Sequence, residues 1–379
     1  MAYSKARRKL RHTAFIELNQ VAAVNVAYSN TSYMTYKGFR LLAIDGSKVR
    51  LPEDDELVIK EFGIHTYFNV KDNSENQCAM ALSSVCYDVL NNIVLDAKLL
   101  PVSTWETEAA LMHIKPRQWN PDLEVSGINI GQGDIVIADR GYCNYLMMAS
   151  LKKVRTDFVI RAKRNCGIKE VNTMLDNIGP DEMLVTFIKP TTKKNKPELY
   201  KELPELLKVR LVRVILNTGE IEVLITSVLD SSVLPMECLK EIYRLRWGVE
   251  SLYAIIKTRL SLENFTGLSP EAIKQDYYST ILLTSIEGIF KQDNDKELNR
   301  VSVAGHKKKT NNAVAFNAIK DNFYDLIFTK RSLNKVIDQI DYLLKANPNQ
   351  IRNDRQVPRR SSANKRILNW YKRKRKILA

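Results

Sequence analysis

The stretch DIVIADRGYCNYLMMASLKKVRTDFVIRAK, residues 134–163, carries the pattern that decides the fold. DIVIA is short and apolar, which is typical of a buried strand, and it delivers Asp139 at its end. YLMMASLKKV is helix-like, and DFVIRAK is strand-like. A strand, a helix and a strand in succession favour parallel pairing with a right-handed crossover. The stretch therefore predicts an α/β domain.

A strand and a hairpin are expected upstream. FRLLAIDGSKVRLP, residues 39–52, predicts a strand that ends at Asp45, with Gly46 turning the chain. CAMALSSVCYDVL and NIVLDAKLLPV are two β-rich runs joined around Asn91 and Asn92, which is the pattern of an antiparallel hairpin. The first three strands are therefore expected to form a meander.

The helix candidate ETEAALMHI, residues 106–114, follows this meander and precedes the strand that ends in Asp139. If that fourth strand lies beside the first, Asp45 and Asp139 emerge side by side at the same edge of the sheet. The sequence thus predicts a pair of neighbouring aspartates.

The character of the chain changes over residues 164–232. A Lys- and Pro-rich piece precedes VRLVRVIL and IEVLITSVL, which flank a turn at residues 217–220 and predict a β-hairpin. This segment is interpreted as an insertion that interrupts the sheet domain. Helical sequence resumes at Pro235, and the last eighty residues are expected to be α-rich.

The charge is concentrated at the two ends of the chain. The net charge is +15, yet residues 13–350 hold 42 basic and 42 acidic residues. Residues 351–379 hold eleven Lys and Arg against one acid. A cationic tail suits a polyanionic partner because each cation that meets a phosphate releases counterions, although a solvated basic end is the simpler alternative. The tail residues expected to contact DNA are Arg359, Arg360, Lys372, Arg373, Lys374 and Arg375.

Other classes of protein are disfavoured. There is no apolar run of roughly 18 residues, and the basic start has no apolar segment behind it, so a secreted or membrane-embedded protein is not expected. The five cysteines and four histidines are scattered, which argues against a zinc site or a disulfide framework. A cytoplasmic protein fits best.

The segment YRLRWGVESLYAIIK, residues 243–257, presents an unusual set of side chains. On a helical wheel at about 100° per residue, Tyr243, Arg246, Glu250 and Lys257 fall within about 60° of one another, beside a separate apolar face. An exposed ion pair between Arg246 and Glu250, worth about 0.2–0.5 kcal/mol, is the simplest explanation.

The two upstream aspartates favour another explanation. Asp45, Asp139 and Glu250 would repel one another unless a cation intervened, and oxygen ligands of this kind suit Mg²⁺ or Mn²⁺. Two such ions about 3.5–4 Å apart can activate a nucleophile and stabilise the leaving oxygen of a phosphoryl transfer. Arg246 and Lys257 would then hold the phosphodiester rather than the carboxylate.

The chain resembles the DDE transposases of bacterial insertion sequences, in the IS-four-type group with the signature Tyr-x2-Arg-x3-Glu-x6-Lys. Tyr243, Arg246, Glu250 and Lys257 match every fixed position of that signature, which arises by chance at about one window in a hundred thousand. Asp45 in LLAIDGS and Asp139 in IADRGY resemble the two aspartates of the family. The resemblance covers roughly residues 39–379.

The resemblance implies a ribonuclease-H-like mixed five-stranded sheet with flanking helices, a β-rich insertion and an α-helical C-terminal region. It implies cut-and-paste transposition by a homodimer that cleaves and joins double-stranded DNA, with no membrane and no nucleotide cofactor. Asp45, Asp139 and Glu250 would be catalytic ligands of two Mg²⁺ or Mn²⁺ ions. Tyr243, Arg246 and Lys257 would contact the DNA backbone, and the protein would be cytoplasmic and associated with the nucleoid.

The expected organisation has five parts. They are a helical segment that resembles the end of the family's DNA-binding region (1–38), the first part of the catalytic domain (39–163), the insertion (164–232), the second catalytic part (233–292) and a helical C-terminal region with the basic tail (293–379). The alternatives are a truncated DNA-binding remnant that inhibits transposition, and another metal-dependent nuclease of ribonuclease-H-like fold.

Overall fold

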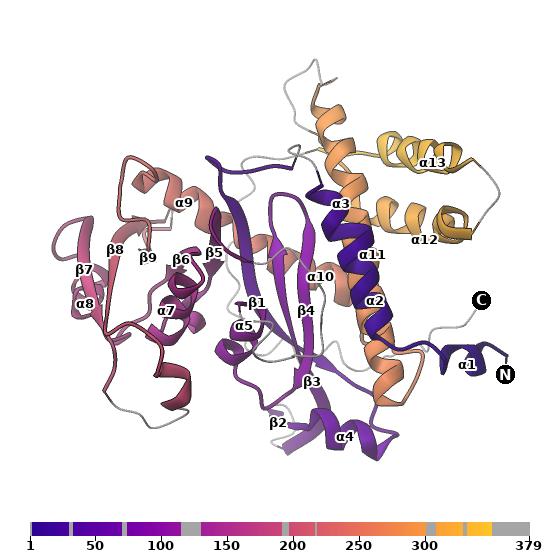
Figure 1. Cartoon of the computed structure of the whole chain (residues 1–379), viewed down its shortest axis with the longest axis horizontal. Helices are drawn as coiled ribbons and strands as arrows, with labels where there is room; N and C mark the ends of the chain where they lie inside the picture. Colours follow the sequence, from indigo (N-terminus) through magenta and orange to yellow (C-terminus); the bar gives the residue numbers. More distant parts are fainter. Residues whose placement is uncertain are drawn as a thin grey trace.

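The computed structural model describes residues 2–29, 33–69, 74–114, 130–191, 197–216, 218–300, 308–328 and 332–350. Its centre is a large mixed sheet with helices on both faces (Figure 1). The basic tail, with Arg359, Arg360 and residues 372–375, lies outside the described residues.

Five strands form the centre of the sheet in the order β4-β3-β1-β5-β6. The strand β1 pairs parallel with β5, and β5 pairs parallel with β6, whereas β1 with β3 and β3 with β4 are antiparallel. The predicted parallel pairing, the hairpin at residues 91–92 and the α/β class with a mixed sheet and flanking helices are thus confirmed. The bounds are β1 Arg40–Arg50, β3 Ser74–Asp88, β4 Ile93–Pro101, β5 Asp134–Ala138 and β6 Asp157–Arg161.

The expected insertion lies in the chain between β6 and α9 (Met236–Leu245), and its strands extend the central sheet. Its strands β7 (Glu182–Ile188), β8 (Leu206–Ile215) and β9 (Ile221–Thr226) extend the order through an antiparallel β6–β9 pair. With β2 (Ile64–Asn69) paired to β3, the sheet has nine strands among the described residues. Because the apolar side chains of the insertion also belong to the cluster beneath β1 and β5, the two parts share one core.

Two details of the predicted meander are wrong. The strand β1 does not end at Asp45, and Gly46 does not turn the chain, since both keep their partners opposite β3 (Val85 and Ser84) and the ladder runs on to Arg50. The partner β3 is fifteen residues long and supplies backbone groups along this whole length. In addition, a helix, α4 (Glu56–Phe62), and β2 intervene between β1 and β3.

Alternate residues of the central strands face opposite helical layers. Leu42 and Val136 pack with helices α5 and α7, whereas Leu41 and Ile135 pack with α9. This period of two is what a sheet buried on both faces requires. The bounds of these and the shorter helices are α5 Glu106–Ile114, η2 Arg140–Tyr142, α7 Tyr145–Lys153, α8 Lys169–Leu175, η3 Pro197–Tyr200, α9 Met236–Leu245 and α10 Trp247–Thr258.

The longest helix, α11 (Pro270–Arg300), runs beside the N-terminal helices and against β4 (Figure 1). It continues without a break through the expected boundary at residues 292–293 between the catalytic part and the C-terminal region. The division of the chain at this point stays a prediction. The N-terminal elements are α1 Ala2–Arg7, α2 Thr13–Leu18, η1 Asn19–Val24 and α3 Asn25–Ala27. After α11 come β10 Lys308–Lys309, α12 Asn312–Phe328, α13 Leu333–Ala346 and β11 Asn349–Gln350, as the expected α-rich region.

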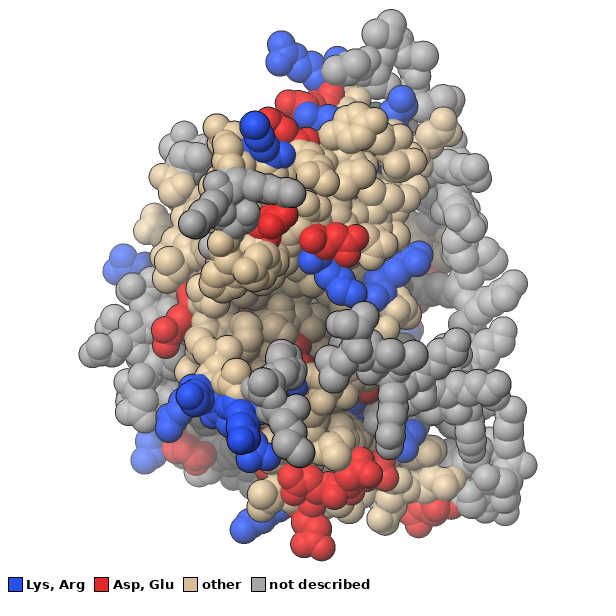
Figure 2. Space-filling view, turned by 90° about the vertical axis from the view of Figure 1, so that its right-hand side faces the viewer, with Lys and Arg blue, Asp and Glu red and all other residues tan. Residues whose placement is uncertain are grey.

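The side of the molecule shown in Figure 2 carries no single field of one charge sign among its described residues. Lys and Arg lie in small groups beside groups of Asp and Glu, separated by uncharged side chains. This agrees with the equal numbers of basic and acidic residues in positions 13–350.

A close approach fixes α11 on the β3–β4 hairpin. A β-carbon at Gly288 would lie 2.1 Å from the carbonyl oxygen of Asn92, at the turn between the two strands. Asn92 itself has a φ of 58°, in the left-handed region that asparagine tolerates well. Glycine at 288 therefore allows the helix to contact the backbone of the turn.

Glu287, the neighbour of Gly288, is a buried carboxyl group. Its side chain is 5% exposed, and its Oε1 has no hydrogen-bond partner among the described residues. Burial raises the pKa of Glu287 to about 7, with Lys291 lowering it and Asp295 raising it. The folded protein therefore binds this proton more tightly than the unfolded chain, and the resulting stabilisation is lost as the pH rises from about 4.5 through about 7.

We expect Glu287→Gln to raise the free energy of unfolding at pH 8 by on the order of 1–3 kcal/mol, because an uncharged amide replaces a buried carboxylate. At pH 4.5 the effect should be small. Urea unfolding at the two pH values measures the difference, with the exposed Glu297→Gln on the same helix as the control. An unchanged pH dependence in Glu287→Gln would contradict this assignment.

Candidate active site

Two aspartates lie side by side on neighbouring parallel strands. Ala43 on β1 is opposite Ile137 on β5, and Asp45 and Asp139 each follow two residues later. The backbone N–H of Gly46 donates to Asp45 Oδ1 at 2.9 Å, and that of Gly141 donates to Asp139 Oδ1 at 2.7 Å. The expected juxtaposition is confirmed, although Asp45 sits within its strand and Asp139 just after its strand.

The predicted single helix over residues 243–257 is wrong in one respect. The chain forms two helices, α9 and α10, that meet at Arg246. There the N–H of Arg246 bonds to the Tyr243 carbonyl and that of Val249 to the Arg246 carbonyl, both over three residues rather than four. This tighter turn disrupts the regular helix that the wheel assumed.

The polar side chains that the helical wheel sets beside the apolar face are also more buried than expected. Tyr243 is 7% exposed and Arg246 is 5% exposed, whereas Glu250 remains half-buried. The hydroxyl of Tyr243 has no hydrogen-bond partner among the described residues. Only part of the set is therefore open to solvent.

Helix α10 is fixed over the aspartates by its apolar face. Val249 and Leu252 are buried in the cluster formed with Ala43 and Val85 of the sheet. The hydroxyl of Tyr253 donates to the backbone carbonyls of Asp45, at 3.1 Å, and Ser83, at 2.9 Å. Glu250, on the preceding turn, is thereby placed near β1.

The three acids influence one another electrostatically. Burial raises the pKa of Asp45 to about 7; the Gly46 N–H opposes this, and the carboxylates of Asp139 and Glu250 raise it further. Arg246 lowers the pKa of Asp45. The site therefore holds more negative charge than its surroundings stabilise.

Arg246 is the cation of this group. Its guanidinium forms an ion pair with Glu250 at 2.7 Å and lies over the rings of Tyr243, at 5.6 Å, and Trp247, at 5.0 Å. The arginine thus pairs with the carboxylate of Glu250, and the ion pair that the simpler explanation predicts is present. Unlike the arginine of a surface pair, however, Arg246 is buried, and its Nε has no hydrogen-bond partner among the described residues.

Lys257, the last residue of the signature, reaches β1 from the far end of α10. Its Nζ donates to Ser47 Oγ at 2.7 Å and to the Lys48 carbonyl at 2.5 Å. The amino group therefore contacts β1, the strand that carries Asp45, two and three residues after that aspartate. The four signature residues span both helices and meet the site from one side.

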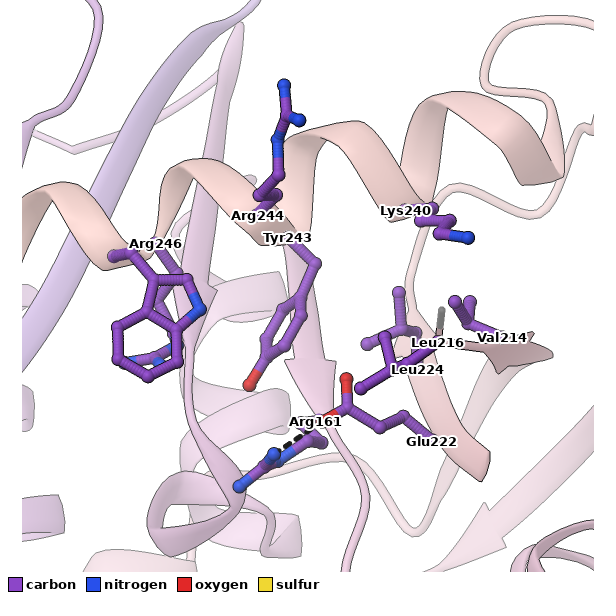
Figure 3. A pocket seen from close by; sticks show the side chains of 10 residues that line it. Arg161, Val214, Leu216, Glu222, Leu224, Lys240, Tyr243, Arg244 and Arg246 are labelled. Atoms are coloured by element: carbon purple, nitrogen blue, oxygen red, sulfur yellow. Dashed lines mark hydrogen bonds and ion pairs between the residues drawn. The ribbon is translucent and has the colours of Figure 1, made fainter. Parts of the chain in front are cut away.

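A pocket of about 110 Å³ adjoins the junction of α9 and α10 (Figure 3). Tyr243 points into it from α9 toward Arg161, which pairs with Glu222 at 2.6 Å. Strands β8 and β9 of the insertion supply the apolar wall. The lining residues are Arg161, Val214, Leu216, Glu222, Leu224, Lys240, Tyr243, Arg244, Arg246 and Trp247.

One acidic residue at the site was missed by the sequence analysis. The side chain of Glu106, at the start of α5, lies against the glycines that follow Asp45 and Asp139. An acid in the first turn of a helix is so common that it carries no signal of its own. Only the packing of α5 beside β1 reveals it.

The donor chemistry of Asp45, Asp139 and Glu250 fits a hard divalent cation, since all three offer carboxylate oxygens and repel one another without one. In this structure, however, the three side chains lie farther apart than the ligands of a bound ion would. Among the described residues, no three side chains of His, Cys, Asp or Glu are gathered closely enough to hold an ion. The ion pair between Arg246 and Glu250 takes up one of the three acids.

Most of the chain is similar to a known family of proteins. Residues 36–285 match the family model "Transposase DDE domain". A provisionally assigned transposase, y4zB, of Sinorhizobium fredii is 25% identical over 155 residues, which are 41% of this chain and 42% of that protein. The chain thus spans less than half the length of this relative.

Among solved structures, a piggyBac transposase synaptic complex with hairpin DNA is similar with a TM-score of 0.43 and 10% identity. The likeness covers 86% of this chain and 61% of that one. Within the described part of the chain, no helix combines the length and apolar character needed to cross a lipid bilayer.

Proposed function

Because the chain belongs to the transposase DDE domain family, we propose that it catalyses the DNA strand cleavage and strand transfer of cut-and-paste transposition. The observation that carries this proposal is that two acids, from other parts of the sequence, lie near enough to Asp45 to raise its pKa. Asp45 lies on β1, Asp139 directly follows the neighbouring strand β5, and Glu250 lies on α10.

Asp45, Asp139 and Glu250 would hold two Mg²⁺ or Mn²⁺ ions. Such ions, when bound, activate the attacking oxygen and stabilise the leaving oxygen of a phosphodiester. The residues of the chain position the site for this chemistry, since Gly46 and Gly141 orient the aspartates through their N–H groups. The Arg246 guanidinium offsets part of the negative charge and would exchange Glu250 for a phosphate when DNA binds.

The substrate in this proposal is double-stranded DNA, both the transposon ends and the target. Tyr243, Arg246 and Lys257 would contact its backbone near the cleaved bond, and the basic tail would add contacts from residues 351–379. The active form would be a homodimer on DNA, and the protein would lie in the cytoplasm with the nucleoid. The IS-four-type subgroup rests on the four-residue signature.

A direct assay tests the proposal. The protein is incubated with Mg²⁺ or Mn²⁺ and a labelled duplex that carries the element's terminal repeats, and products with 3′-hydroxyl nicks or hairpins are sought. Their appearance supports the transposase. If the protein binds the duplex in gel shifts but forms no product, the proposed enzymatic activity is overturned and the DNA-binding inhibitor is favoured. Cleavage that does not depend on the terminal repeats would favour a general nuclease.

Deleting residues 351–379 is expected to weaken DNA binding, because this tail holds eleven basic residues and one acid. The slope of log K against log salt concentration should become shallower by about 0.9 for each phosphate that is no longer neutralised. Titrations at several salt concentrations measure it, with deletion of the uncharged residues 361–364 as the control. An unchanged slope would show that the tail neutralises no phosphate.

A further inference from the structure

Glu106 brings a fourth carboxylate to the two aspartates. A β-carbon at Gly46 would lie 3.3 Å from Glu106 Cγ. A β-carbon at Gly141 would lie 3.4 Å from Glu106 Oε2 and 3.0 Å from Asp139 Oδ1. Carboxylate oxygens of Glu106 and Asp139 therefore border the same small space beside Gly141.

No side chain among the described residues pairs directly with this carboxylate. Glu106 forms no hydrogen bond or ion pair there, whereas Glu250 is paired with Arg246. Burial raises the pKa of Glu106, Asp139 raises it further and Lys48 lowers it. Two acids thus face one another where a cation would be stabilised by both.

A buried hydroxyl beside these acids also lacks a partner. Tyr142, on the turn after Asp139, is fully buried, and its hydroxyl has no hydrogen-bond partner among the described residues. Burial raises its pKa well above the usual range, and Asp45, Glu106 and Asp139 all contribute. A buried hydroxyl without a partner is costly, so its position among acids points to a further species, such as the water of a hydrated ion.

The position of Glu106 is fixed by the packing of α5. His113, near the end of the helix, bonds to Asp96 Oδ2 on β4 at 2.7 Å and to Ser84 Oγ on β3 at 3.0 Å. Beside Glu106, Thr107 Oγ1 accepts a hydrogen bond of 3.1 Å from the Asn144 side chain. The end of α5 is therefore tied to β3 and β4, and its start is tied to Asn144, which precedes α7.

We propose that Glu106 is a fourth carboxylate of the active site and helps to bind the divalent cation beside Asp139. This inference rests on the proposed function, in which that cation serves DNA cleavage. It adds an acid from α5, on the face of the sheet opposite α10. The ion would then be held from both sides of the two aspartates, while Glu250 is shared with Arg246.

The test compares the full chain with Glu106→Gln and with Glu108→Gln as the matched control. Glu108 is on the same helix, about 200° around its axis from Glu106. Isothermal titration with Mn²⁺ should give a dissociation constant that rises by about tenfold or more in Glu106→Gln and stays at the wild-type value in Glu108→Gln. Cleavage of the labelled duplex is measured in parallel.

Thermal unfolding separates a metal ligand from a structural residue. Without metal, Glu106→Gln should melt at or above the wild-type temperature, because one of two repelling charges is gone. Its rise in melting temperature on adding Mn²⁺ should be smaller than that of wild type. A lower metal-free melting temperature with unchanged Mn²⁺ affinity would assign Glu106 a structural role and overturn the proposal.

The remaining outcomes separate the two proposals. If wild type binds Mn²⁺ and cleaves DNA while Glu106→Gln binds Mn²⁺ equally well, only the role of Glu106 is overturned. If Glu106→Gln loses Mn²⁺ affinity but wild type cleaves no DNA, the site stands and the transposase function is overturned. A wild-type protein that binds no Mn²⁺ overturns both.

Discussion

Replacing Asp139 with asparagine is expected to lower the rate of DNA strand cleavage by about three orders of magnitude or more while DNA binding persists. Asp139 follows β5 directly, and its carboxylate is one of the acids proposed to hold the ions. An amide keeps the shape and can still accept from the Gly141 N–H, but it removes one negative charge. A loss of about 4 kcal/mol of transition-state stabilisation corresponds to this decrease in rate.

The cleavage assay and a gel shift on the same duplex give the two measurements. Glu237→Gln, which removes one charge from the exposed first turn of α9, is the matched control and should cleave at the wild-type rate. Retained cleavage in Asp139→Asn would rule out Asp139 as a ligand. Loss of binding together with cleavage would point to a folding defect, which circular dichroism would detect.

The second large effect concerns the fold. Gly288→Ala is expected to lower the free energy of unfolding by about 3 kcal/mol or more. The new methyl group would meet the Asn92 carbonyl oxygen at 2.1 Å and its carbon at 2.9 Å. These are backbone atoms of a tight turn, which cannot rotate away as a side chain would, so α11 must shift from the hairpin.

Gly248→Ala on α10 is the matched control, because it makes the same substitution in a helix. There the nearest atom to the added carbon is a Val89 methyl group at 3.4 Å, an ordinary contact. The higher helix propensity of alanine, about 1 kcal/mol, should leave this variant as stable as wild type or more so. Urea unfolding of both variants checks the prediction, and equal stabilities would contradict it.

Local patterns were sufficient for the centre of the fold. The apolar run ending at Asp139, the helix at residues 145–153 and the strand at 157–161 each follow from periodicity, and the crossover rule orders them. The position of Asp45 beside Asp139 then follows from parallel pairing. The sequence alone was therefore sufficient to predict that the two aspartates lie side by side.

The remaining features depend on tertiary contacts. The end of β1 could not be read from Gly46, because the length of the partner strand β3 decides how far the ladder runs. The break at Arg246 is marked by no proline, and the apolar periodicity continues across it, so the helical pattern alone did not reveal it. The packing of the buried guanidinium over two aromatic rings has no sequence signal. Glu106 joins the site only through the packing of α5.

The continuous β6–β9 pairing has a consequence for anyone who wishes to shorten this protein. Deleting residues 164–232 would remove β9, the partner of β6, and leave the backbone N–H and C=O groups of β6 unpaired at the edge of the sheet. This edge would lie next to β5, the strand that leads to Asp139. Such edges recruit strands from other molecules and cause aggregation. A minimal version of the protein should therefore keep β9 or cap β6 with a charged, proline-bearing segment.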